Sequence, residues 1–176
     1  MKKVLKFFAY FAFFILALMA FIPKESAYYF LEKELKNFDV VISKETLHSS
    51  IPSLRIENLN ITTKGIDSAK VQSVDVTLLG LYNSLTCEDI SLSTLVESYL
   101  PSKIEKLHIS YSIFDPLHLN ARGHGDFGSF DANVHLIDRN ATVSLKPSKL
   151  MLKRYRNSLR FFKKSKNGEY TYAASL

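Results

Sequence analysis

The pattern of hydrophobic and polar positions changes three times along the chain. Residues 7–22 are uncharged and apolar, residues 24–37 have helical spacing, residues 38–146 mostly alternate, and residues 147–166 return to helical spacing. A period of 3.6 indicates a helix with one buried face, whereas a period of two indicates a strand. We therefore expect a mainly β protein with helices before and after its sheet region.

The apolar stretch predicts a basic head and transmembrane anchor over residues 1–23. A spanning helix needs about 20 predominantly apolar residues, and three lysines precede this stretch. The positive-inside rule keeps such lysines in the cytoplasm. In a bacterium, the chain would then be a single-pass inner-membrane protein with its bulk in the periplasm. A signal peptide cleaved after Ala20 or Ala27 is the alternative, although neither position has the pair of small residues that cleavage prefers.

The next segment, residues 24–37, predicts a short amphipathic helix. Leu31 and Leu35 share its apolar face, and Glu32 and Lys36 form an outward i,i+4 pair.

Residues 38–146 predict an antiparallel β domain of about eight or nine strands, most simply connected as a meander. Such strands have one apolar and one polar face. Between residues 54–56 and 59–61 the alternation slips by one position, which predicts a bulge or a tight turn. Residues 79–85 and 93–101 interrupt the alternation and are expected to be helical or irregular.

The apolar face of this sheet has to be covered, and the pattern leaves two possibilities open. Either the sheet closes on itself, sandwich-like, with the two amphipathic helices completing a core, or it curls partly and leaves a groove for lipid acyl chains. The candidate lining residues of the groove are apolar positions on the later strands: Leu107, Ile109, Tyr111, Ile113, Leu117, Leu119, Val134, Leu136, Val143 and Leu145.

Residues 147–176 predict a basic amphipathic helix followed by a terminal strand. Residues 146–166 contain nine Lys or Arg and no Asp or Glu. The basic face is either solvated, or in contact with anionic lipid headgroups, or a docking site for an acidic partner. The side chains concerned are Lys153, Arg154, Arg156, Arg160, Lys163 and Lys164.

Little else in the sequence indicates chemistry. The histidines lack convergent metal-ligand spacing, no arrangement of catalytic residues stands out, and no basic-aromatic module indicates nucleic acid. We therefore expect no enzyme activity, metal or cofactor.

Cys87 is the single cysteine and is expected to be a small buried residue. Asn140 lies in an Asn-x-Thr sequon with an acid two residues earlier, so it is a candidate glycosylation site.

The order of these segments resembles the type II secretion protein N and AsmA-like group of membrane-anchored periplasmic proteins. The matching stretches are IPKESAYYFLEKELKNFDVVISKETL, SLRIENLNI, KVQSVDVTLLGLYNSLTCEDISLS and the glycine-bearing RGHGDFGSFDANVHLIDRNATVSLKPSKL. The chain is short for this group, and the resemblance does not account for its basic last helix. Anchor proteins of lipopolysaccharide export share the size and architecture but usually lack the helix at residues 24–37.

The resemblance implies a curved β groove that faces lipid. The expected function is non-enzymatic binding or handling of lipid acyl chains, from phospholipid or lipopolysaccharide, in envelope biogenesis. The alternative is a structural or assembly component of a type II-like secretion machine, acting through contacts with other envelope or secretion proteins.

Overall fold

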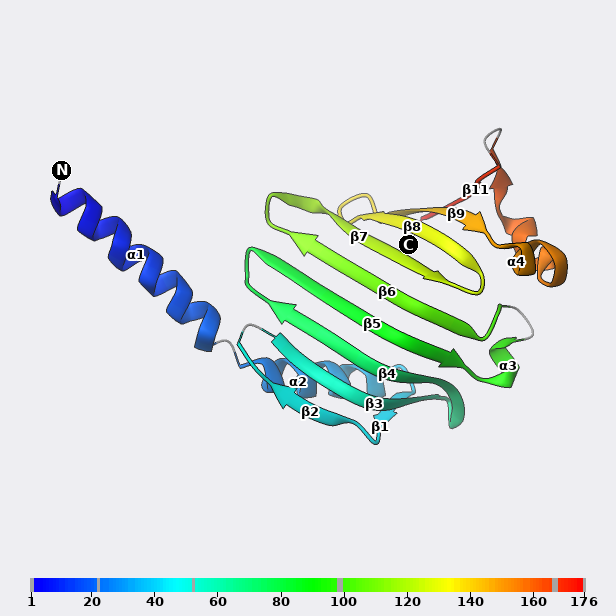
Figure 1. Cartoon of the computed structure of the whole chain (residues 1–176), viewed down its shortest axis with the longest axis horizontal. Coiled ribbons are helices and arrows are strands. Elements are labelled where there is room, and N and C mark those ends of the chain that lie inside the picture. The colour runs from blue at the N-terminus through cyan, green and yellow to red at the C-terminus, as the bar shows by residue number, and fades with distance from the viewer. Residues whose placement is uncertain (1, 22, 52, 98–99, 166–167, 176) are drawn as a thin grey trace.

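The computed structural model describes residues 2–21, 23–51, 53–97, 100–165 and 168–175, without the side chains of residues 2, 18–20 and 96. It confirms the mainly β class, with 54% of residues in strands. Eleven strands form one antiparallel sheet, and helices precede and follow it in the chain (Figure 1).

Helix α1 (Lys2–Phe21) forms over the apolar stretch and extends away from the sheet (Figure 1). Its apolar side chains, including Leu5, Phe7 and Tyr10, are exposed. No helix within the described ranges is long and apolar enough to cross a membrane. The predicted transmembrane span is therefore not supported by the structure.

Helix α2 (Lys24–Lys36) confirms the amphipathic helix predicted for residues 24–37. Its predicted ion pair is present, with Lys36 Nζ 2.8 Å from a Glu32 carboxylate oxygen. The predicted apolar face was partly wrong, because Leu31 is exposed while Tyr28 is only 6% exposed. The face that meets the sheet is rotated toward Tyr28, whose ring contributes more apolar area than a leucine.

The sheet follows the predicted meander from β3 to β9. Along the sheet the order is β1-β3-β4-β5-β6-β7-β8-β9-β11-β10, and β2 also pairs with β3. The strands are β1 (Val40–Ser43), β2 (Thr46–Ser49), β3 (Ser53–Thr63), β4 (Ile66–Leu78), β5 (Tyr82–Leu92), β6 (Lys103–Ser112), β7 (Asp115–Gly125), β8 (Gly128–His135), β9 (Asn140–Pro147), β10 (Lys163–Lys164) and β11 (Tyr170–Ser175).

Of the two predicted interruptions, one was too long. Residues 82–85 belong to β5. Leu85 and Cys87 alternate in one phase, and Ile90 continues on the same face only after the strand slips by one residue, so the earlier part of the strand was not recognised. In the second interruption, α3 (Thr94–Glu97) forms a single helical turn before β6.

The predicted slip is absorbed inside β3 rather than in a turn. Asn58, between buried Ile56 and Leu59, has a φ of 60°. Similar slips occur at the same height along neighbouring strands. One is at Asp89 of β5, with a φ of 50°, and another is the register irregularity after Ile104 of β6. Asparagine and aspartate tolerate this left-handed conformation better than other non-glycine residues. The slip keeps apolar side chains on one face along the full strand length.

Asn58 allows a direct test of this conformation, since its side chain is exposed and its loss removes no packing. Asn58→Val is expected to lower the free energy of unfolding by about 1–2 kcal/mol, because a β-branched residue is strained at positive φ. Asn58→Gly is expected to be neutral or stabilising. Urea unfolding followed by circular dichroism compares the two; equal losses would contradict the assignment.

The C-terminal region departs from the predicted single helix over residues 147–166. Helix α4 (Lys149–Arg154) begins at Ser148, whose hydroxyl accepts a hydrogen bond from the Met151 N–H at 3.1 Å. It ends at Tyr155, and the 3-10 helix η1 (Arg156–Phe161) follows. The tighter turn brings Leu159 and Phe162, three residues apart, to the same side, where both pack in one apolar cluster. The terminal strand predicted near residues 169–173 is β11.

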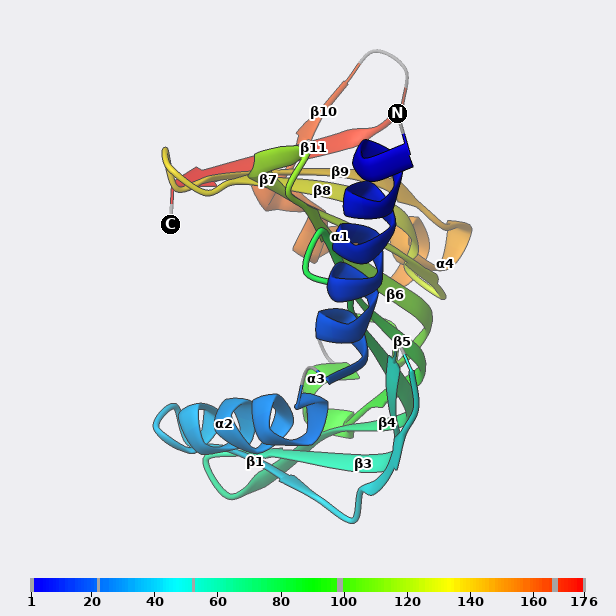
Figure 2. The same ribbon diagram turned by 90° about the vertical axis from the view of Figure 1, so that its left-hand side faces the viewer.

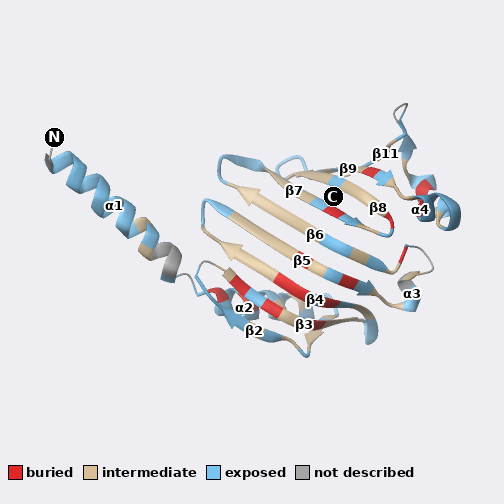
Figure 3. Ribbon diagram, in the orientation of Figure 1, coloured by how far each residue is buried: buried red, intermediate tan, exposed pale blue. Residues whose placement is uncertain are grey.

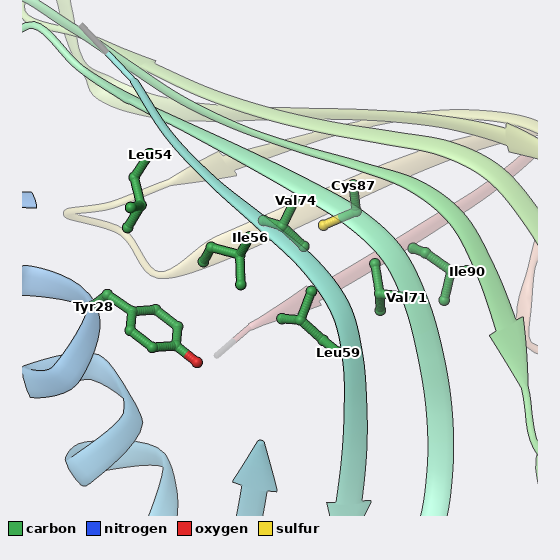
Figure 4. Packing of buried hydrophobic residues seen from close by; sticks show 8 residues of the cluster. All are labelled: Tyr28, Leu54, Ile56, Leu59, Val71, Val74, Cys87 and Ile90. Carbon is green, nitrogen blue, oxygen red and sulfur yellow. The ribbon is translucent and has the colours of Figure 1, made fainter. Parts of the chain in front are cut away.

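The most buried part of the molecule lies between α2 and strands β3 to β5 (Figure 3). Figure 4 shows Tyr28 pointing from α2 toward Ile56 and Leu59. Burial, together with the nearby carboxylates of Glu45 and Glu32, raises the pKa of Tyr28 above its usual range. Its side chain is therefore neutral at physiological pH.

Candidate binding groove

The sheet is curved, and its concave face stays open along one side. In Figure 2 the strands form a C, with α2 inside the lower arm and α4 beneath the upper arm. The two ends of the sheet, at β1 and β10, do not pair with each other in the described structure. Because Tyr28 of α2 packs on Leu54 and Ile56, the face that carries these residues is the concave one. The open-groove alternative therefore describes this sheet better than a closed sandwich.

The concave face is lined by cross-strand rows of apolar residues. Each row follows the pairing from strand to strand, so its members have neighbouring side chains on one face. One row is Ile56, Val74, Cys87, Leu107, Gly123, Phe130, Leu145 and Tyr170. The next is Leu54, Val76, Leu85, Ile109, Ala121, Ala132, Val143 and Tyr172.

The convex face is polar, so the two faces differ in the way that one-sided burial predicts. Ion pairs connect neighbouring strands on this face, such as Lys106 with Glu88 at 2.9 Å and Arg122 with Asp131 at 2.9 Å. These surface pairs contribute little to stability. They show that water, and not a second sheet, is the expected neighbour of the convex face.

An apolar pocket of about 260 Å³ lies at one end of the concave face. Strands β6, β8 and β9 supply Ile104, Phe130, Val143 and Leu145, and the C-terminal helices and the segment after them supply Met151, Ser158 and Phe162. Leu92, Leu100, Pro101 and Phe127 complete the lining, so Ser158 is its one polar member among the described residues. Such a pocket suits an uncharged apolar group.

A glycine shapes this end of the groove. Gly123 lies opposite Phe130 in the β7–β8 ladder, and a Cβ built on Gly123 would come 2.5 Å from the Phe130 ring. The missing side chain therefore lets the aromatic ring lie across β7 and form part of the pocket wall.

The predicted lining residues fall into three groups. Val143 and Leu145 line the pocket, and Leu107, Ile109, Tyr111, Leu119 and Val134 follow the cross-strand rows of the concave face. The structure places the remaining three, Ile113, Leu117 and Leu136, at exposed positions in or beside the hairpin turns.

The predicted lining left out the earlier half of the concave face, where Tyr28 of α2 packs on the sheet. The strongest burial is on β3 to β5, at Leu54, Ile56, Leu59 and Val71. The same alternation is visible there in the sequence, and reading it through the slip at Asn58 would have found these residues. The alternation could not identify Phe127 and Met151. Phe127 lies in the turn between β7 and β8 and Met151 lies in α4, and these elements bring the two side chains to the pocket.

The six predicted basic residues are all exposed but do not share one helix. Lys153 and Arg154 end α4, Arg156 and Arg160 belong to η1, and Lys163 and Lys164 form β10. The Arg160 guanidinium lies 4.8 Å from the centre of the Phe161 ring. Within the described ranges none of these six has an ion pair with a carboxylate.

Cys87 lies on the concave face and is buried, as predicted. Burial raises the pKa of its thiol to about 11. Since the thiolate is the reactive form, we expect Cys87 to react with a disulfide reagent at pH 8 about a hundredfold more slowly in the native protein than in urea. A fast native reaction would contradict its buried position.

The histidines do not form a metal site in the described structure, in which no group of three or more His, Cys, Asp or Glu is placed to hold a metal ion. His118 and His135 face each other across β7 and β8, with ring centres 5.0 Å apart. Each is bound to a carboxylate, His118 to Asp115 at 2.6 Å and His135 to Asp138 at 3.0 Å.

Asn140 is exposed at the first position of β9, and its glycosylation stays a prediction.

A scan of protein-family models and searches of curated proteins and of solved structures found no match to this chain. The resemblance to the type II secretion protein N and AsmA-like group therefore also stays a prediction.

Proposed function

We propose that this chain is a non-enzymatic, membrane-anchored protein that binds or passes lipid acyl chains along its concave face. The observation that carries the proposal is the row-by-row apolar lining of an open sheet, which ends in an apolar pocket under α4 and η1. Half-buried apolar side chains that line an open face, such as Leu107, Ile109 and Val143, indicate a binding partner. A polar or charged ligand would find few partners on this face.

The dimensions of the groove are consistent with one acyl chain. The concave positions of β6 extend from Ile104 to Tyr111, which are seven residue steps apart, or about 23 Å at 3.3 Å per step. The acyl chains of one leaflet cover about half of a bilayer core of roughly 30 Å. Each methylene transferred from water would contribute about 0.8 kcal/mol.

Helix α1 supports the anchoring part of this proposal. Its apolar side chains are exposed around the helix and are not covered by the sheet. Residues 7–17 of this helix carry no charge, and the lipid interior would cover their exposed apolar side chains. The lysines at its N-terminal end favour a cytoplasmic N-terminus, which would place the β domain in the periplasm of a bacterium, at the inner membrane.

Photo-crosslinking with a diazirine-bearing phospholipid tests the proposal in the full chain. Crosslinks to α1 would report anchoring alone. We expect additional crosslinked peptides from β6, β8 and β9, at concave positions such as Ile109 and Val143. Crosslinks confined to α1 would contradict lipid handling by the groove and would favour the alternative, an assembly role through protein contacts.

A further inference from the structure

The hairpin tips at one edge of the sheet are unusually apolar. Pairing puts the starts of β3, β5, β7 and β9 at the same edge as the ends of β2, β4, β6 and β8. We call this side of the sheet, where these strand ends and their connections lie, the anchor edge; it is distinct from the outer strands β1 and β10. Exposed apolar side chains occupy the connections there: Ile51, Leu81, Ile113, Phe114, Leu136 and Ile137. Phe114 is 85% exposed, and Ile51 and Ile137 are each 71% exposed.

These tips depart from ordinary turn chemistry. Turns favour Gly, Pro, Asn, Asp and Ser, and exposed apolar residues grouped on one edge indicate an interaction surface. Residues 79–81 and 113–114 contain no charge. Asp115, directly after residues 113–114, and Asp138, in the connection between β8 and β9, are each bound to a histidine, His118 and His135 respectively.

The tips are held together as one surface. The Ile113 N–H donates to the Leu81 carbonyl at 3.0 Å, and the Leu136 N–H donates to the Leu117 carbonyl at 2.8 Å. These bonds connect successive hairpins across the sheet. Apolar side chains on such linked hairpins can meet a flat partner together.

The anchor edge is also where α1 joins the body. Pro23, Lys24 and Ser26 line a shallow hollow with Ser50 and Ile51, so the end of α1 lies beside the first tip. Figure 1 shows α1 on this side of the sheet, extending away from it roughly along the strand direction. Figure 2 views the molecule from this side and shows the C-shaped end of the groove.

The opposite edge differs in its charge. Apolar side chains are exposed there too, among them Phe38, Ile66 and Leu95. This end also carries the basic segment, where Leu150 and Leu152 stand among Lys149, Lys153 and Arg154. Strand β6 has 10 residues, so the two edges are about 33 Å apart. A body that stands on its anchor edge would hold the basic segment that far from the bilayer.

We propose that the six tip residues form a second membrane contact, which seats the open end of the groove on the bilayer that holds α1. This inference rests on the anchoring proposed above. Apolar side chains of an interfacial segment enter the headgroup and acyl boundary by about 5–10 Å, and Arg139 between the tips can meet anionic headgroups. An acyl chain then passes from bilayer to groove without crossing water.

Single tryptophans test this contact in the full chain, which has none of its own. The F114W variant reports on the anchor edge, and F161W, at another exposed phenylalanine, is the matched control for the opposite edge. Each is reconstituted into vesicles of phosphatidylcholine and phosphatidylglycerol with brominated acyl chains. We expect quenched, blue-shifted emission from F114W and unquenched emission from F161W. Equal emission of the two variants, quenched or not, would overturn the contact.

Two further measurements separate this inference from the function it rests on. If the protein fails to float with vesicles, anchoring itself is wrong and the contact is wrong with it. If V143D abolishes acyl binding, quenching of F114W in that background is still expected, because the bilayer and not the groove ligand causes it. Loss of quenching in that background would overturn the contact while leaving the groove function intact.

Discussion

Replacing Val143 with aspartate is expected to abolish acyl binding while leaving the sheet folded. Val143 lies on the concave face and lines the pocket, in the same row as Ala132 and Tyr172. A carboxylate there would have to lose its hydration for a chain to bind, which is strongly unfavourable without a partner. Because every 1.4 kcal/mol is tenfold in affinity, we expect a loss of at least tenfold.

The matched control is Thr142→Asp, one residue earlier on β9 and exposed on the other face. Binding of a dansyl-labelled fatty acid, followed by its fluorescence, compares both variants with the parent protein. Circular dichroism checks that each is folded. Equal binding by V143D and T142D would show that the ligand does not occupy the concave face.

Gly128→Ala is expected to lower the free energy of unfolding by about 3 kcal/mol or more. Gly128 begins β8 with a φ of 114°, a conformation that strains any L-residue by about 1–3 kcal/mol. A Cβ there would also overlap the Lys146 carbonyl oxygen and approach the Ser148 N–H, both backbone groups. Overpacking of this kind typically costs a further 1–3 kcal/mol, since backbone cannot rotate away.

Gly80→Ala separates these two effects. Gly80 also has positive φ, 74°, but a Cβ there would meet nothing within 4 Å. Its substitution is therefore expected to cost only about 1–2 kcal/mol. Urea unfolding of residues 24–176 measures both variants. Equal losses would mean that β9 does not approach Gly128 as closely as the structure places it.

The alternation of the sequence predicted the class, the meander and the apolar rows in the later half of the concave face. It worked best from β6 to β9, where Leu107, Ile109 and Val134 alternate with polar residues without interruption. At the slips it was incomplete: the slip at Asn58 was predicted without deciding between a bulge and a turn, and the slip at Asp89 was missed. Periodicity alone could not distinguish such a slip from a turn.

The pocket could be predicted only in part. Val143 and Leu145 follow from their strand, whereas Met151 and Phe162 reach the pocket because the expected long helix breaks at Tyr155. Helical spacing is similar for an α-helix and a 3-10 helix over one turn, so the break left no clear signal. Likewise, the curvature that keeps the groove open is a property of the whole sheet, set by twist and bulges and not by any one segment.

Native mass spectrometry of residues 24–176, purified from cells without detergent, tests the central claim most directly. Removing α1 takes away the segment that would bind lipid for anchoring alone, and leaves the sheet with α2 and the pocket. Lipid handling predicts a folded protein that carries phospholipid or lipopolysaccharide at a defined stoichiometry. A folded, stable protein with a clean unliganded mass would contradict it and would assign the concave face to protein partners.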